Sequence, residues 1–234
     1  MAKNSLYETY NAITPVYERT SRAITLGLLV KWRRETINLG LRALNDPGNG
    51  LNILDAGSGP GNMTIELIKS GVNVRYAVLL DQSMIMLNAA PNLINVDKVR
   101  GSFEYMPFRA SAFDMVIMGF SLHTANDLRR AYCEISRVLN NGGVLASVSI
   151  GKPVNPIYRG LGWLYTAVVI PLIVLVVAGL RYIPYFYDIH NIYRRLPPND
   201  VFRSMAGGCL RLIQYMDKAL GLANIIIMRK WDHG

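Results

Sequence analysis

One short stretch of this chain, from Leu51 to Gly61, constrains its fold more than any other. It reads Leu-Asn-Ile-Leu-Asp-Ala-Gly-Ser-Gly-Pro-Gly, an apolar run that ends in an acid and then in three glycines at alternate positions. Such a run predicts a buried strand that leads through a glycine-rich turn into a helix, here Asn62 to Lys69. Glycine suits the turn because a Cβ atom would obstruct both positive φ angles and a ligand that approaches the backbone.

The spacing of these glycines separates two kinds of nucleotide-binding turn. A dinucleotide fold has the pattern G-x-G-x-x-G, whereas here the last glycine follows the second by only two residues. The pattern D-x-G-x-G-x-G resembles motif I of the class I methyltransferases, which bind S-adenosylmethionine. The resemblance implies that five residues of the turn surround the methionine end of this cofactor, namely Asp55, Gly57, Ser58, Gly59 and Gly61.

The rest of the chain predicts an α/β fold in which strands alternate with helices. Apolar runs predict four further strands, at Val74–Leu80, Val96–Gly101, Phe113–Gly119 and Val144–Ile150. Helical periodicity predicts helices at Ser83–Ala90 and Leu128–Leu139, the second with Asn126 as its N-cap. Two closing strands, at residues 210–215 and 224–228, bring the expected sheet to seven. This alternation predicts a mostly parallel sheet with helices on both faces and a ligand at the carboxyl ends of the strands.

An acid, Asp81, ends the second predicted strand, twenty residues after Gly61. An acid at this place is positioned to accept hydrogen bonds from the 2′- and 3′-hydroxyl groups of a ribose. We include the next residue, Gln82, in the same predicted cofactor site. The structural alternative for Asp81 is an N-cap of the helix that begins at Ser83, and the two roles are compatible.

We divide the chain into four segments. They are an N-terminal helical cap at residues 1–45, a Rossmann-like core at 46–151, an apolar helical lid at 152–197, and a helix with closing strands of the same sheet at 198–234. The run from Asn45 to Gly50 is dense in turn formers and predicts a loop between the cap and the core. Thr25 to Ile37 has near-helical spacing and predicts an amphipathic helix in the cap.

The lid contains 21 residues without a charge, from Gly160 to Leu180. This length is sufficient to span a bilayer. Pro171 lies near the centre of the run, and together with the glycines it predicts two short apolar helices instead. Because the strands on both sides belong to one predicted sheet, a single crossing is excluded. Two helices that dip into one leaflet, and a lid over an apolar pocket, both remain open.

The net charge of +9 is unevenly distributed. Residues 151–234 carry 10 Lys and Arg against 4 Asp and Glu, interleaved with aromatic and aliphatic residues, which favours an anionic membrane surface as partner. The sequence has no arginine-rich arm, zinc finger or helix-turn-helix pattern, so we expect no nucleic acid partner.

The two cysteines, Cys133 and Cys209, lie outside any metal-binding spacing. We therefore expect buried free thiols, a reducing compartment and no metal site. The run from Met1 to Tyr10 has no apolar core behind its lysine, so no secretory signal is expected. Together these features predict a cytoplasmic protein.

Several further motifs are spread over the whole chain. They are Tyr17-Glu18, Gly27 with Trp32-Arg33-Arg34, Glu104-x-Met106-Pro107-Phe108 with Phe113-Asp114, Arg137-Val138-Leu139-x-x-Gly142-Gly143, Lys152-Pro153-Val154-Asn155-Pro156, and Arg194-Arg195-x-Pro197. With these motifs the chain resembles the ubiquinone/menaquinone biosynthesis C-methyltransferases, which methylate a ring carbon of a demethylated quinol. The resemblance implies a Rossmann-like class I methyltransferase fold with an inserted lid, S-adenosylmethionine as cofactor, and a lipid-tailed aromatic substrate.

The chain departs from that family at two places. Where the family has Gly-Asp-Ala, this chain has Gly101-Ser102-Phe103; we expect Ser102 to accept a hydrogen bond and Phe103 to stack on the adenine. Where the family has Leu-Arg-Asn, this chain has Leu122-His123-Thr124, after Phe120, which we also place in the cofactor site.

The histidine at the second departure suggests a mechanism. Removing the proton of a ring hydroxyl makes the neighbouring carbon a better nucleophile, and histidine, with an ordinary pKa of about 6.5, suits this step. We therefore predict that His123 is the general base, directly or through a water; a polar residue that caps the following helix is the alternative. Tyr17 is a second catalytic candidate because its phenol could close over cofactor and substrate, although a packing role fits equally. His190, in the lid, is a weaker candidate for contact with the quinol ring.

The sequence thus predicts an S-adenosylmethionine-dependent C-methyltransferase that acts on the ring of a demethylated, demethylmenaquinol-like isoprenoid quinol. We expect it to be peripheral on the inner face of the cell membrane, and a homodimer is left open. Three alternatives remain at this point: a methyltransferase acting on another lipid or small aromatic acceptor, a non-catalytic membrane-associated cofactor-binding protein, and an RNA-binding homologue.

Overall fold

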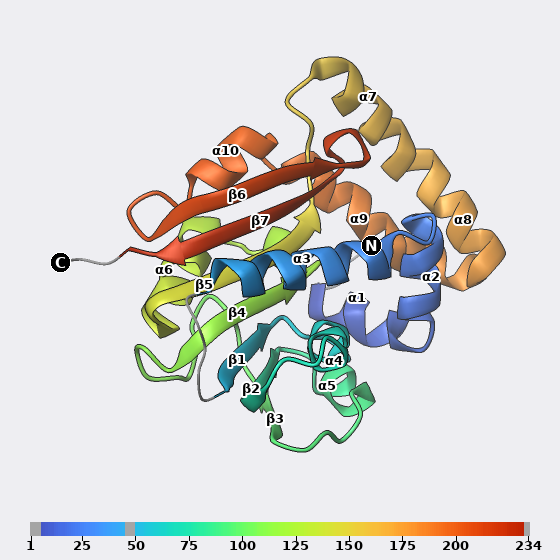
Figure 1. Cartoon of the computed structure of the whole chain (residues 1–234). Coiled ribbons are helices and arrows are strands. Elements are labelled where there is room, and N and C mark those ends of the chain that lie inside the picture. The colour runs from blue at the N-terminus through green and yellow to red at the C-terminus, as the bar shows by residue number, and fades with distance from the viewer. Residues whose placement is uncertain (1–5, 45–49, 232–234) are drawn as a thin grey trace.

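A single twisted sheet runs through the molecule (Figure 1). The computed structural model describes residues 6–44 and 50–231. The strands are β1 (Leu51–Ala56), β2 (Val74–Asp81), β3 (Val96–Arg100), β4 (Phe113–Gly119), β5 (Leu139–Ile150), β6 (Leu210–Lys218) and β7 (Ala223–Lys230). Their order is β3-β2-β1-β4-β5-β7-β6, and β7 is antiparallel to both of its neighbours while the other pairs are parallel. The predicted seven-stranded, mostly parallel sheet is confirmed.

Helices cover both faces of this sheet. They are α1 (Leu6–Ile13), α2 (Tyr17–Ile24), α3 (Leu29–Ala43), α4 (Asn62–Lys69), α5 (Met84–Ala89), α6 (Leu128–Val138), α7 (Pro156–Leu164), α8 (Ile170–Val177), α9 (Ile183–Arg195) and α10 (Asn199–Ser204). Neighbouring residues of a strand point to opposite faces. Val116 and Leu145 therefore pack in the cluster with α6 and α10, whereas Met115 and Val144 pack in the cluster with α3 and α4. Each of these fully buried side chains contributes about 1.5–3 kcal/mol to stability.

The predicted start of β5 and the predicted N-cap of α6 were wrong. Strand β5 begins at Leu139 rather than Val144, because Leu139 already pairs with Phe113 and the strand continues through the two glycines. The N-cap of α6 is Asp127, whose carboxylate accepts a hydrogen bond from the N–H of Arg130 at 3.0 Å. The predicted cap, Asn126, instead donates its N–H to Glu104 at 2.7 Å.

The lid does not form two separate helices. Helices α7 and α8 are joined by a π-helical turn, η3 (Tyr165–Val169), into one helical run, Pro156–Val177. Pro171 lacks an N–H group and its ring crowds the preceding turn. The wider π-helical turn comes just before this proline, so the helix continues where a break was predicted.

This helical run is long and apolar enough to cross a membrane, and only 22% of its most apolar window is buried. However, β5 precedes it and β6 and β7 follow it, and all three strands belong to the same sheet (Figure 1). A single crossing would place parts of one sheet on opposite sides of a bilayer. It is therefore excluded, as the sequence predicted.

A buried asparagine, Asn199, closes the base of the lid. Its side-chain oxygen accepts from the N–H of Lys152 at 2.7 Å, and its amide nitrogen donates to the carbonyl of Gly221 at 2.9 Å. The backbone adds a third link, because the N–H of Gly151 donates to the carbonyl of Leu222 at 2.9 Å. The segment that enters the lid, the segment that leaves it and the β6–β7 turn are thus held together at one point.

The prediction of free thiols was wrong. Cys133 on α6 and Cys209 just before β6 form a disulfide. The side chain of Ser136, one turn further along α6, donates to the carbonyl of Cys209 at 2.7 Å, so the two segments are in direct contact here. Of the predicted loop at Asn45–Gly50, residues 45–49 lie outside the described residues.

Candidate active site

The glycine turn after β1 is anchored to the end of the neighbouring strand. The N–H groups of Gly57 and Ser58 both donate to the carbonyl of Leu80, at 2.8 and 3.0 Å. Gly57 has a φ of +68°, and a Cβ atom on it would lie 2.4 Å from the Cβ of Ser121. A larger residue would therefore be strained and would collide with the turn after β4. The positive φ and this close contact explain why the turn requires glycine at position 57.

The acid at the end of β2 faces the same turn. One carboxylate oxygen of Asp81 accepts from the N–H of Gly59 and the other from the N–H of Ser83, each at 2.8 Å. Burial raises the pKa of Asp81 above its ordinary value, and its backbone hydrogen bonds act in the opposite direction. The N-cap of α5 is Ser83, whose hydroxyl accepts from the N–H of Met86 at 3.1 Å.

A cavity of about 410 Å³, called the cofactor cavity below, lies at the carboxyl ends of β1, β2 and β4. Seven of the ten predicted cofactor-binding residues line it, namely Gly57, Ser58, Gly59, Asp81, Gln82, Phe103 and Phe120. The predicted place of the ligand, at the carboxyl edge of a parallel sheet, therefore coincides with a real cavity. Its volume falls in the range of small-molecule sites.

The other three predicted residues are not among those that line the cofactor cavity. Asp55 is fully buried, and its carboxylate accepts from the N–H and the hydroxyl of Thr64 at 3.1 and 2.8 Å, which holds the start of α4. Burial raises the pKa of Asp55 to about 7. Gly61 is the N-cap of α4, and the hydroxyl of Ser102 accepts from the N–H of Glu104 at 3.1 Å. These three residues therefore support the segments that form the wall of the cofactor cavity.

Two charged residues of the cofactor cavity were missed by the sequence analysis. Arg33 of α3 is only 3% exposed and is the only cation among the described lining residues. Its Nη1 atom donates to both carboxylate oxygens of Glu18, at 2.9 and 3.1 Å, while its Nε atom has no hydrogen-bond partner among the described residues. Glu104 is 7% exposed and lines another part of the wall. Arg33 lies in the Trp-Arg-Arg motif, which was the only signal for it.

These lining groups fit S-adenosylmethionine. The cofactor has a carboxylate, a ribose with two hydroxyls and an aromatic base, and the cavity offers a buried guanidinium, a carboxylate at the ribose position and the ring of Phe103. Among the described residues the buried Nε atom of Arg33 has no acceptor, and a carboxylate is the acceptor that suits a guanidinium.

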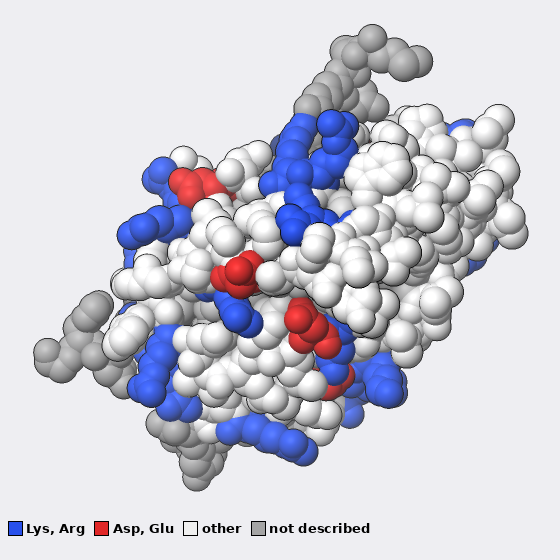
Figure 2. Space-filling view, turned by 90° about the horizontal axis from the view of Figure 1, so that it is seen from above, with Lys and Arg blue, Asp and Glu red and all other residues white. Residues whose placement is uncertain are grey.

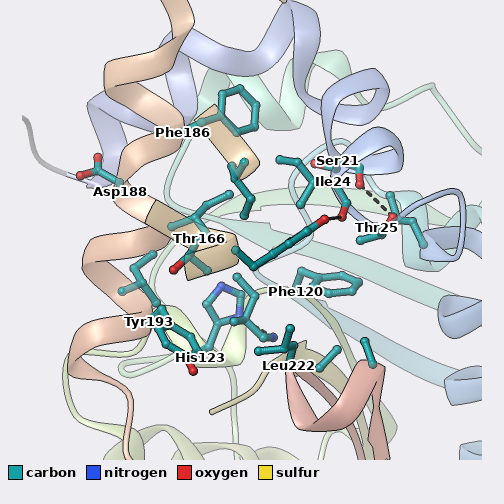
Figure 3. A pocket seen from close by; sticks show the side chains of 18 of the residues that line it. Ser21, Ile24, Thr25, Phe120, His123, Thr166, Phe186, Asp188, Tyr193 and Leu222 are labelled. Carbon is teal, nitrogen blue, oxygen red and sulfur yellow. Dashed lines mark hydrogen bonds between the residues drawn. The ribbon is translucent and has the colours of Figure 1, made fainter. Parts of the chain in front are cut away.

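A second cavity, of about 330 Å³, lies between the N-terminal helices, the lid and the β6–β7 turn (Figure 3). We call it the apolar cavity because aliphatic and aromatic side chains dominate its wall, among them Ile24, Leu29, Ile170, Phe186, Ile192 and Leu222. Tyr10, Tyr17 and Phe120 line both cavities, so the two spaces adjoin at these three rings. Phe120 has a φ of +59°, and its N–H donates to the carbonyl of Val148 at 2.7 Å, which holds the ring at the junction.

Both predicted catalytic residues line the apolar cavity. His123 is 6% exposed and points into the space beneath Thr166 and beside Phe120 (Figure 3). Burial lowers its pKa to about 3. Its Nδ1 atom accepts from the N–H of Ile150 at 3.4 Å and lies 3.3 Å from the hydroxyl of Ser149. Burial raises the pKa of Tyr17, which keeps its phenol protonated.

The third histidine considered, His190, is not among the lining residues of either cavity. It is 2% exposed, and its Nδ1 atom lies 2.9 Å from the hydroxyl of Thr166, which does line the apolar cavity. It therefore supports Thr166 in the wall of the apolar cavity and does not itself line that cavity.

The strand order, the glycine turn after β1 and the acid after β2 place this chain among the class I S-adenosylmethionine-dependent methyltransferases. Solved structures agree on the fold. A putative S-adenosyl-L-methionine-dependent methyltransferase from Methanococcus maripaludis superposes with a TM-score of 0.59 at 20% identity, over 100% of this chain and 98% of that one. An S-adenosylmethionine-dependent methyltransferase from Thermotoga maritima, described as a possible histamine N-methyltransferase, gives 0.59 at 16% identity, over 97% and 100%.

The family follows from the sequence itself. The model of the ubiE/COQ5 methyltransferase family matches residues 2–230, and the chain belongs to this family. It is 30% identical over 170 residues to the demethylmenaquinone methyltransferase of Lactiplantibacillus plantarum, which is 70% of each chain. It is also 30% identical over 166 residues to that of a Roseiflexus species, 70% of this chain and 67% of the relative. The predicted family, fold class and cofactor are thereby confirmed, and the protein is an enzyme.

Proposed function

We propose that this enzyme transfers a methyl group to a ring carbon of a demethylated isoprenoid quinol. The observation that carries the proposal is the apolar cavity, which adjoins the cofactor cavity at Tyr10, Tyr17 and Phe120. An isoprenoid tail gains about 0.8 kcal/mol for each CH₂ group that it buries, so a wall of this composition favours a lipid-tailed acceptor. The names of the two relatives, both demethylmenaquinone methyltransferases, support the same class of substrate.

We assign each end of the cofactor to residues of its cavity. Arg33 faces the carboxylate of the methionine part, Asp81 the ribose hydroxyls, and Phe103 the adenine. When bound, S-adenosylmethionine supplies an electrophilic methyl group. In this proposal the rings of Tyr10, Tyr17 and Phe120, which line both cavities, lie between the cofactor and the acceptor.

The role of His123 follows from its protonation state. With its pKa lowered to about 3, the ring is neutral at physiological pH. Because Nδ1 accepts from Ile150, the neutral ring carries its proton on Nε2, as assigned from the hydrogen bonds. We propose that this N–H donates to a quinol oxygen and stabilises the negative charge that develops there. The general-base role stays a prediction, and the pH profile described in the Discussion tests whether His123 titrates with an ordinary pKa.

Tyr17 belongs to the same proposal as a residue that closes over cofactor and acceptor. Because burial raises the pKa of its phenol, the phenol stays protonated at physiological pH and donates a hydrogen bond. As a residue that lines both cavities, it contacts cofactor and acceptor together.

Three further statements belong to the proposal. The enzyme works at the inner, cytoplasmic face of the cell membrane, for which the exposed apolar helix Pro156–Val177 is the support. The four segments divided at residues 45, 151 and 197 act in this proposal as cap, cofactor-binding core, lid and closing part of the sheet.

A homodimer stays a prediction, and light scattering of the purified enzyme checks it.

The test uses labelled S-adenosylmethionine with a panel of demethylated naphthoquinols and benzoquinols, each with and without an isoprenoid tail. We expect label on a ring carbon of at least one quinol, and faster turnover with the tailed form. Label on an oxygen or nitrogen atom, or no transfer to any quinol by an enzyme that binds the cofactor in calorimetry, contradicts the proposal.

A further inference from the structure

Two leucines that line the apolar cavity are also exposed to solvent, and we take them to mark its mouth. Leu26 lies in the turn between α2 and α3 and is 77% exposed, and Leu220 lies in the turn between β6 and β7 and is 60% exposed. Both side chains nevertheless line the apolar cavity. They come from segments almost 200 residues apart in sequence, and they form the two lips of its mouth.

Both lips have an unfavourable backbone conformation. Leu26 has a φ of +51° and Leu220 a φ of +58°, and Ala219 beside it has a φ of +46°. A residue with a bulky side chain in this region costs about 1–3 kcal/mol, whereas glycine adopts it freely. The enzyme therefore retains a strained leucine in water at both lips, and stability gives no reason for this choice.

Both lips are also joined to the lid helix. The hydroxyl of Tyr165 donates to the carbonyl of Ile24 at 2.5 Å, which ties the end of α2 to the π-helical turn. On the other side, Gly162 of α7 packs so closely against Leu222 that a Cβ atom would lie 2.3 Å from it. The mouth and the lid helix thus form one continuous surface.

This surface is apolar and is bordered by cations. Its exposed side chains include Leu161, Trp163, Leu164, Val168 and Val176, the last 86% exposed. Seen from above, the end of the molecule over α7 and α8 carries few charged side chains (Figure 2). Exposed Arg22 and Lys31 stand on either side of the α2–α3 turn. Apolar side chains with a tryptophan, bordered by Lys and Arg, suit the interface of an anionic bilayer.

We propose that Leu26 and Leu220 form a lipid portal that inserts into one leaflet of an anionic membrane. An isoprenoid tail then passes from the bilayer into the apolar cavity between the two lips, and its apolar surface does not cross water. The portal rests on the proposed function, because it presupposes a lipid-tailed acceptor. It adds the route of that acceptor and the residues that make the route.

The double variant Leu26→Asp/Leu220→Asp tests the portal. Its readout is the ratio of kcat/KM for a long-tailed demethylnaphthoquinol in phosphatidylglycerol vesicles to kcat/KM for the tailless quinol. We expect this ratio to fall at least tenfold, and flotation with the same vesicles to fall with it, because a carboxylate at each lip opposes insertion. The matched control is Ile94→Asp, since Ile94 is 90% exposed but does not line either cavity.

A second double variant, Leu26→Gly/Leu220→Gly, separates the portal from misfolding. Glycine relieves the strained backbone, so we expect an unchanged or higher unfolding temperature together with weaker vesicle flotation. A tail-to-tailless ratio within twofold of the parent in both variants overturns the proposal, and so does an equal loss in the Ile94→Asp control. If the parent enzyme floats with vesicles through its lips but methylates no quinol, the portal stands and the proposed substrate fails.

Discussion

The two cavities of this enzyme differ in how they are built. The cofactor cavity is made by turns at the carboxyl ends of adjacent strands, where backbone N–H groups and Asp81 are held by the sheet itself. The apolar cavity is made mainly by segments outside the sheet, namely α1, α2, the start of α3, the lid and the β6–β7 turn. The ends of β4 and β5 add Phe120, His123 and Ile150. In the proposed reaction the methyl group passes between them at Tyr10, Tyr17 and Phe120, the three residues that line both cavities.

This difference separates two tasks of the enzyme. Recognition of the cofactor depends on the register of the sheet, which changes little without disrupting the core. Choice of the acceptor depends on covering segments whose side chains can be exchanged with the sheet intact. Changes in one cavity are therefore expected to leave ligand binding in the other almost unaffected, and the following predictions test this separation.

The largest effect is expected from Asp81→Ala. The change removes the carboxylate assigned to the ribose and two hydrogen bonds that hold Gly59 and Ser83. Charge-assisted hydrogen bonds are worth about 1.5–3 kcal/mol each, so calorimetry should show affinity for S-adenosylhomocysteine falling at least ~100-fold. Binding of menadione in the apolar cavity should stay within about twofold. The exposed Asp97→Ala serves as control, and an equal loss in both cavities would break the separation.

Arg33→Gln should have the next largest effect. If Arg33 holds the cofactor carboxylate, affinity for S-adenosylhomocysteine falls about 10- to 100-fold. Affinity for 5′-methylthioadenosine, which lacks the carboxylate, should not change. The neighbouring Arg34→Gln is a matched control because Arg34 pairs with Glu66 on the surface. A loss of both ligands in calorimetry would mean that Arg33 only supports the fold through Glu18.

His123→Ala should lower kcat about 10-fold, the value of one hydrogen bond to a developing charge, with KM for the cofactor unchanged. Since the pKa of His123 is lowered to about 3, the ring stays neutral and kcat should not fall between pH 8 and pH 5. A general base with an ordinary pKa would instead lose activity below about pH 6.5. A pH profile of kcat for the parent and the variant tests whether His123 titrates with an ordinary pKa, and unchanged kcat in the variant removes His123 from the mechanism.

The last prediction concerns the stability of the fold and leaves ligand binding aside, and it uses Asp55→Asn. The pKa of Asp55 is about 7 in the folded enzyme, and it is ordinary, about 3.9, in the unfolded chain. The folded state thus binds the proton more tightly, so this group lowers the free energy of unfolding as pH rises from about 4 to about 7. The variant cannot titrate and should lack this decline in urea midpoints measured at pH 5 and pH 8. An identical decline in variant and parent contradicts the assignment.

The sequence predicted the regions of the molecule that have a strong local pattern. The boundaries of β4 at Phe113–Gly119 and of α4 at Asn62–Lys69 agree with the structure, because buried strands and amphipathic helices have a regular period. The glycine turn and the acid that line the cofactor cavity followed from motif I and from the end of β2 for the same reason. Local patterns carry this information because the residues that act together are also close in sequence.

The parts that were missed depend on contacts between distant segments. Arg33 reaches the cofactor cavity from α3, outside any strand end, and its pairing with Glu18 leaves no periodic signal. The disulfide joins residues 76 positions apart, and the π-helical turn that carries the helix past Pro171 has no sequence pattern of its own. The apolar cavity is assembled from stretches far apart in the sequence, so only its composition was visible beforehand.

The hydrogen bonds of Asn199 at the base of the lid have a consequence for how such enzymes diversify. One buried side chain and a few backbone hydrogen bonds close the base of the lid. The 46 residues between Lys152 and Asn199 are therefore an insertion that begins and ends at the same place beside the sheet. Such an insertion can be exchanged as a unit. A relative with the same base could carry a different lid, and with it act on a different acceptor, while its cofactor site remained intact.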